Sequence, residues 1–158
     1  MKSLYTPYYK KDKFKIENNY AMMEIQVSKF TSENLDVITV YRSSRGSIVV
    51  LKSILKQLVE KKEKAILITG DFNICYMTKR NNEINKELEE NGFHQLMQDA
   101  SHIQGGHIDH VYWRPGNQMW KAPIIERHSP YYSDHDASLV TLTGNILIVE
   151  SPMNEFYL

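Results

Sequence analysis

Apolar and β-branched residues gather in two short runs near the start of the chain. One run extends from Tyr20 to Val27 and the next from Leu35 to Tyr41, and the polar stretch Lys29 to Asn34 separates them. Short runs of this composition with a polar break between them are typical of strands. We predict two adjacent strands here, with Glu24 on an outward face.

The following segment changes to a helical spacing. Apolar residues recur three or four positions apart, at Ile48, Leu51, Leu55, Leu58 and Val59. This spacing places them on one face of a helix, and the serine just before them is of a type that caps helix N-termini. We therefore predict one amphipathic helix, capped by Ser47, that ends in the charged run 60–64.

A continuous apolar run from Ala65 to Thr69 follows and leads into Asp71. Such a run indicates a strand that is covered on both faces. Further on, Ile84 and Leu88 mark a second, shorter helix, and the Asn-Gly pair at 91–92 signals its end.

Several strand-like runs complete the pattern, with turn residues between them. They cover residues 107–113, 121–127, 137–142 and 145–150. Strands that alternate with two helices and are followed by several more strands predict an α/β or α+β sandwich. Since no internal repeat or low-complexity tract marks a boundary, we predict a single domain over residues 1–158.

Composition narrows the class of protein. Of the 158 residues 42% are apolar, which is enough for one core, and 19 basic residues balance 19 acidic ones. Zero net charge gives no support to a nucleic-acid partner held by charge alone, although residues 1–15 carry five lysines against one acid. We interpret that start as a solvated lead-in, with a phosphate-contacting arm as the alternative.

The cysteine content and the hydropathy of the chain indicate in which cellular compartment the protein is expected. Cys75 is the single cysteine, which excludes an internal disulfide framework and a CxxC zinc site and fits a reducing compartment. No apolar run approaches the roughly 18 residues that cross a bilayer. We expect a soluble intracellular protein, nuclear or cytoplasmic, with no membrane partner.

Three acidic residues stand where a strand ends or a loop begins. They are Asp71 in TGDFN, Asp109 in GGHIDH and Asp134 in YSDHDA. Taken alone, GDFN is a strand-to-turn signal whose polar side chains bond the local backbone. Phosphodiester hydrolysis, however, needs carboxylates that hold a hard cation against a dianionic transition state, and Asn73 and His135 add donors for phosphoryl oxygens. The set suits phosphoryl chemistry.

Two other groups of residues have a structural interpretation. If 107–113 is a strand, His107 and His110 point to opposite faces, so we expect no joint zinc ligation by these histidines. Trp113 and Trp120, close to a turn, are predicted to pack in the core or its rim rather than to stack on bases.

Read in order, the motifs resemble a known family. They are TVYRS at 39–43, a helix, ILITGDFN at 66–73, NGF at 91–93, SHIQGGHIDHV at 101–111 and SDH at 133–135. This succession resembles the endonuclease/exonuclease/phosphatase superfamily, and it looks most like the endonuclease domains of non-LTR retrotransposons, relatives of the apurinic/apyrimidinic endonucleases. The resemblance covers about residues 18–143.

The resemblance implies a role for each site residue. Asp71 matches the aspartate that orients or deprotonates the attacking water, and Asn73 matches the amide that contacts the phosphate. Asp134 is similar to the carboxylate near the divalent metal. His135 resembles the histidine that stabilises the phosphoryl oxygens, and Asp109 resembles the aspartate that holds this histidine in position.

The resemblance also implies a fold and a limit on metal binding. Tyr41 matches a tyrosine that reaches the phosphate, and the family domain is a four-layer α/β sandwich of two similar halves, of which this chain resembles the second half and a little more. The first half normally contributes an asparagine and a metal-binding glutamate. Glu17, Glu24 and Glu33 are the glutamates before Tyr41, and none has the expected context. We therefore predict a partial four-layer sandwich that binds Mg²⁺ or Mn²⁺ weakly.

From these observations we expect a metal-dependent endonuclease that hydrolyses phosphodiester bonds of nucleic acid, DNA rather than RNA. Two alternatives stay open: a catalytically impaired binding or regulatory module on the same scaffold, and a phosphatase acting on a small phosphorylated molecule. A half-sandwich would leave an apolar sheet face, so we also expect a homodimer or a second chain that completes the sandwich.

Overall fold

The computed structural model describes residues 15–22, 24–32, 34–60, 63–76, 82–97, 106–117, 120–130 and 132–144. The lysine-rich start up to residue 14 and the strand predicted at 145–150 lie outside these residues. The elements are β1 (Lys15–Met22), β2 (Ile25–Thr31), β3 (Leu35–Arg42), α1 (Ile48–Leu58), β4 (Ala65–Asp71), α2 (Asn82–Glu90), β5 (His94–Gln95), β6 (Asp109–Arg114), β7 (Ile124–His128) and β8 (Ala137–Thr141). Within the described part of the chain no helix is long and apolar enough to span a membrane.

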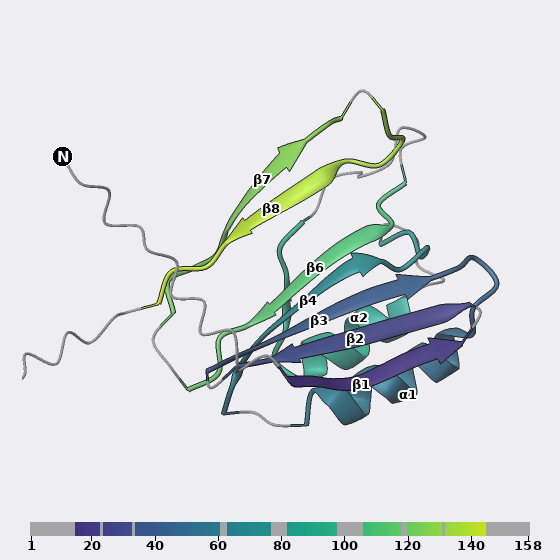
Figure 1. Cartoon of the computed structure of the whole chain (residues 1–158). Coiled ribbons are helices and arrows are strands. Elements are labelled where there is room, and N and C mark those ends of the chain that lie inside the picture. Colours follow the sequence, from purple (N-terminus) through teal and green to yellow (C-terminus); the bar gives the residue numbers. More distant parts are fainter. Residues whose placement is uncertain are drawn as a thin grey trace, which may run out of the picture.

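The described elements form three layers (Figure 1). Six strands pair in the order β1-β2-β3-β4-β6-β5, and β7 and β8 form a separate two-stranded sheet. β3 and β4 are parallel and α1 connects them, whereas the other neighbouring strands are antiparallel. Both helices cover one face of the large sheet, and the β7–β8 hairpin lies on the other side (Figure 1). This architecture confirms the predicted α/β class and a partial sandwich.

The first part of the sheet corrects the prediction of two strands. The run from Tyr20 to Val27 contains the end of β1, a turn at Glu24 and the start of β2, so three strands precede α1. Glu24 is therefore a turn residue rather than an outward strand position. β-type composition alone does not reveal a tight turn that lacks glycine or proline.

The predicted polar break after β2 is also wrong, because β2 continues to Thr31. Lys29 is buried on the helix side of the strand, where its ammonium group lies 3.0 Å from a carboxylate oxygen of Asp36 and 3.3 Å from the carbonyl oxygen of Leu58. The buried carboxylate also lies 3.3 Å from Lys64. Pairing with two lysines compensates the cost of burying this charge.

The helices and the central strand follow the sequence pattern. The Ser47 hydroxyl accepts a hydrogen bond from the amide of Val50 and caps α1, as predicted. Ala65 to Ile68 are buried, as a strand covered on both faces requires. α2 ends just before Gly92, which has the left-handed φ of 81° that favours glycine after a helix.

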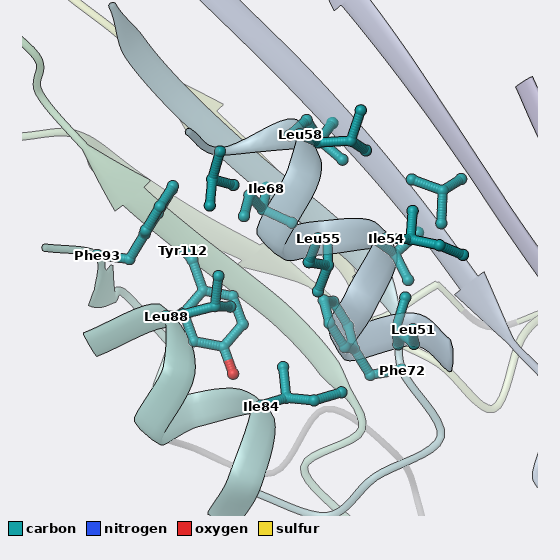
Figure 2. Close-up of a cluster of buried hydrophobic side chains, with 14 of the residues drawn as sticks. Leu51, Ile54, Leu55, Leu58, Ile68, Phe72, Ile84, Leu88, Phe93 and Tyr112 are labelled. Carbon is teal, nitrogen blue, oxygen red and sulfur yellow. The ribbon is translucent and has the colours of Figure 1, made fainter. Parts of the chain in front are cut away.

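One apolar cluster fills the space between the helices and the sheet (Figure 2). Leu51, Leu55 and Leu58 of α1 meet Ile84 and Leu88 of α2 over the buried side chains of the sheet. Burial of this many aliphatic side chains, each worth roughly 1.5–3 kcal/mol, makes the helix side the main source of stability.

A second, smaller cluster joins the hairpin to the opposite face of the sheet. Trp113 packs edge-on against Trp120 at 5.8 Å between ring centroids. Ile125 and Val140 of the hairpin pack against the same cluster. Both tryptophans are thus packing residues, as the sequence predicted, and they help to fix the hairpin over the sheet.

Two buried histidines contradict the expectation that they point to opposite faces. β6 begins at Asp109, so His107 precedes the strand, and its ring lies 5.3 Å from the ring of His110. His110 Nε2 is 2.8 Å from the carbonyl oxygen of Ile74, and Nδ1 is 3.1 Å from the Tyr112 hydroxyl. Since both ring nitrogens of His110 have protein partners, the structure still offers no support for zinc at this pair.

His110 should make the fold sensitive to mild acid. Burial, with the nearby His107 as a second cause, lowers the pKa of His110 from 6.5 to about 4. As the pH falls below 6.5 the unfolded chain binds a proton that the folded chain does not. The free energy of unfolding should therefore decrease between pH 6.5 and about 4, by at most about 3 kcal/mol. Urea titrations across this range should show a flatter pH profile for His110→Gln, and equal profiles would contradict the prediction.

Candidate active site

Three of the predicted site residues occupy one row across the large sheet. Tyr41 pairs with Asp71 in the parallel β3–β4 register, and Asp71 pairs with Asp109 in the antiparallel β4–β6 register. Alternation along β4 places Asp71 on the face of Ala65 and Leu67, which belong to the cluster under the hairpin. The row therefore lies on the face opposite the helices, at the carboxyl end of the two central strands.

Glycine at position 70 permits this arrangement. A Cβ atom there would lie 1.9 Å from the carbonyl oxygen of Val40, and Gly70 has a φ of 141°. Both facts exclude any larger residue without a shift of β3 or β4. The glycine of the GDFN motif thus allows β4 to approach β3 closely just before Asp71.

Asp71 is held by the turn that follows it. Its Oδ1 accepts a hydrogen bond from the backbone amide of Asn73 at 2.8 Å, and its Oδ2 accepts one from the Asn73 side-chain amide at 3.1 Å. Asn73 has a left-handed φ of 48°, a conformation that asparagine tolerates better than most residues. The local turn interpretation of GDFN therefore describes this geometry, and the same turn holds the Asp71 carboxylate within the row.

His135 reaches the row from the loop between β7 and β8. Its Nδ1 lies 2.9 Å from Oδ2 of Asp109, and since a carboxylate accepts, the imidazole Nδ1–H donates. Both side chains are partly exposed, at 33% for His135 and 20% for Asp109. The hydrogen bond to Asp109 is the main cause that raises the pKa of His135, and the charges of Asp71 and Asp134 contribute in the same direction.

Asp71, Asp109 and His135 form a cluster that could hold a metal ion. One ligand atom from each lies within 4.8 Å of the others, and among the described residues it is the one group of three or more such side chains. Asp134 is exposed and does not belong to this group, although its charge acts on His135. Two carboxylates and an imidazole suit Mg²⁺ through the oxygens, or Mn²⁺ through both kinds of ligand.

One residue of this region was not apparent from the sequence pattern. Arg42, the last residue of β3, is 5% exposed. Its guanidinium donates to the carbonyl oxygen of Gly46 in the loop after β3 and to that of Phe72 in the loop after β4. The pattern placed Arg42 in a polar loop, because arginine is seldom buried and nothing in RSSRGS distinguishes a buried arginine from a solvated one.

Comparison with known proteins gives a fold. No protein-family model matches the sequence, and no curated protein matches it significantly. Among solved structures, the endonuclease domain of TRAS1, a telomere-specific non-LTR retrotransposon, is similar with a TM-score of 0.53 at 14% identity, over 75% of this chain and 61% of that domain. The chain has part of the endonuclease/exonuclease/phosphatase fold.

Two further solved structures share the resemblance at lower scores. A mannosyl-6-phosphatase of Bacteroides thetaiotaomicron gives a TM-score of 0.48 at 14% identity, over 75% of this chain and 56% of that one. An endonuclease/exonuclease/phosphatase family protein of Leptotrichia buccalis gives 0.47 at 14% identity, over 82% and 62%. In each case the chain spans less than two thirds of the length of the structure that it resembles.

The hydrogen bond between His135 and Asp109 should raise the pKa that a titration of the His135 imidazole measures. Because Asp109 raises the pKa of His135, the imidazole should remain protonated at a higher pH than an exposed histidine. In Asp109→Asn the pKa of His135 should fall toward its ordinary value. NMR titration of the imidazole in metal-free protein measures this, with His135 in the unsubstituted protein as the reference. An unchanged titration in Asp109→Asn would show that the hydrogen bond does not exist in solution.

Proposed function

We propose that this chain is a metal-dependent phosphodiester hydrolase that acts on nucleic acid. The observation that carries the proposal is the cluster of Asp71, Asp109 and His135, with each ligand atom within 4.8 Å of the others. A base, a cationic donor and an oriented carboxylate at such distances can act together on one phosphate group. The partial fold supports the same class of chemistry by analogy alone.

Each residue of the cluster has a role in an in-line attack of water. Asp71 accepts two hydrogen bonds from Asn73, and its carboxylate orients the attacking water and accepts its hydrogen bond. Protonated His135 lies next to the phosphate and donates to the oxygens on which negative charge develops. Asp109 holds the imidazole by the 2.9 Å hydrogen bond and stabilises its cationic form.

Tyr41 and a divalent cation complete the proposed site. Tyr41 is 46% exposed in the row that contains Asp71, so its hydroxyl is accessible to a phosphate. Mg²⁺ or Mn²⁺, when bound by the cluster carboxylates with Asp134 nearby, neutralises charge on the phosphate. Few protein ligands are available, so we propose that binding is weak and that the substrate phosphate supplies further ligands.

DNA is the substrate that we propose. One similar solved structure, with a TM-score of 0.53, is the endonuclease domain of a retrotransposon, which supports a polynucleotide over a small phosphorylated molecule. Since the chain has a net charge of zero, its contacts with DNA must come from the residues around the site rather than from an overall positive potential.

Nicking of supercoiled plasmid tests this function. With Mg²⁺ or Mn²⁺ the purified chain should convert supercoiled to open-circular DNA, and EDTA should abolish the conversion. Asp71→Asn and His135→Ala should each lower the rate by about 100-fold or more, since each removes an acid–base or charge-stabilising group. Gel quantification of the nicked product measures the rates.

A matched control removes a carboxylate away from the cluster. Glu126 is exposed on β7, so Glu126→Gln should nick at the unsubstituted rate. Absence of nicking under all metal conditions, in folded protein, would contradict the proposal and favour a binding module. Release of phosphate from a small phosphomonoester without nicking would favour a phosphatase.

We also propose that a second copy of the chain, or another chain, covers the outer face of the hairpin. Ile124 and Leu139 are 59% and 52% exposed there, which is unusual for large apolar side chains. Light scattering at high micromolar concentration should give at least a dimeric mass, and Leu139→Lys should reduce it. A monomeric mass at all concentrations would rule out self-association. A different partner chain would then have to bind, and a gain in mass on mixing the two chains would show it.

A further inference from the structure

Arg42 and Asn73 hold each other's backbone at the end of the sheet. Nη1 of Arg42 donates to the carbonyl oxygens of Phe72 at 3.0 Å and Asn73 at 3.1 Å. In return, Nδ2 of Asn73 donates to the carbonyl oxygen of Arg42 at 2.8 Å. We call this reciprocal pair the Arg42–Asn73 clasp. It joins the last residue of β3 to the turn that directly follows Asp71, the last residue of β4.

The clasp determines how the Asn73 amide is used. Its Nδ2 also donates to Oδ2 of Asp71 at 3.1 Å, so the two N–H groups have a carbonyl and a carboxylate as acceptors. Only the NH₂ end of the amide can satisfy both, which fixes the orientation of the side chain. Asn73 therefore donates its side-chain amide hydrogens to Asp71 and to the carbonyl oxygen of Arg42 at the end of β3.

Burial and hydrogen bonding explain why position 42 carries arginine. The guanidinium is 5% exposed, and it also reaches the carbonyl oxygens of Gly46 at 2.8 Å and Ser44 at 3.5 Å. A planar group with five donors can serve acceptors from two separate loops, whereas a lysine ammonium has three donors and a shorter reach. The positive charge also lies close enough to Asp71 to interact with it.

We infer that Arg42 is a positioning residue that fixes the Asp71 carboxylate through the Arg42–Asn73 clasp. The inference rests on the proposed function for its consequence in catalysis. It assigns Arg42 no contact with substrate. Without the fork of hydrogen bonds, the turn 72–73 would sample other conformations, and Asp71 would lose the fixed orientation toward water that an in-line attack requires.

Hydrogen exchange in Arg42→Lys tests the clasp without any activity. This variant keeps the positive charge but loses the hydrogen bonds that the guanidinium donates to both loops. Local opening of the turn should become easier, so the backbone amide of Asn73 should exchange about tenfold faster or more. Amides of α1, such as Leu55, should change by less than about twofold after correction for global stability. Plasmid nicking should show kcat lower by about tenfold with KM nearly unchanged.

Arg114→Lys is the matched control. Arg114 is also a buried arginine, 6% exposed, but it pairs with Ile66 at the opposite end of β4. It should lower overall stability and leave the exchange at Asn73 and the kcat near their unsubstituted values. If Arg42→Lys and Arg114→Lys speed up exchange at the Asn73 amide equally, the inference is overturned, because the effect would then come from a loss of global stability.

A measurement on the unsubstituted protein covers the case in which Arg42→Lys does not fold. The Nδ2 hydrogens of Asn73, which the carbonyl oxygen of Arg42 and the carboxylate of Asp71 accept, should exchange with solvent much more slowly than those of the exposed Asn117. Equal exchange rates would overturn the clasp. Slow exchange in a protein that does not nick DNA would uphold the clasp and refute the proposed function, so the two failures are distinguishable.

Discussion

The parallel pairing of β3 with β4 is the constraint on which the rest of the structure depends. It needs α1 as the connection between the strands, which places a helix on one face and leaves the other for the site. It also needs the glycine at position 70, since β3 occupies the space where any Cβ would stand. This register places Tyr41 beside Asp71, and the antiparallel register of β4 with β6 adds Asp109 to the same row.

The two faces of the sheet have different physical characters. The helix side is filled by aliphatic and aromatic side chains, and its few charges, such as Lys29 and Asp36, are paired within it. The hairpin side combines a smaller apolar cluster with partly exposed acids and a histidine. A rigid apolar layer behind the strands thus supports polar groups that must remain accessible to solvent and ligand.

The sequence allowed the elements with strong periodicity to be predicted and missed those that depend on tertiary contacts. The helix that became α1 and the buried strand predicted from Ala65 to Thr69, which β4 extends to Asp71, follow from their patterns. The turn at Glu24 and the burial of Lys29 do not, because a pattern of single residues shows neither a hairpin register nor a partner such as Asp36. The order of motifs singled out Asp71, Asp109 and His135, which the fold brings together, whereas Arg42 is apparent only from the carbonyl oxygens that surround it.

His135 and Asp109 come from different sheets, since one lies in the loop between β7 and β8 and the other begins β6. Their hydrogen bond therefore connects two layers between which apolar side chains pack, including those of Trp113 and Trp120. A substitution that thins this packing, even one far from any charged group, would change the separation of donor and acceptor. The pKa of His135 can therefore report on the packing between the hairpin and the large sheet.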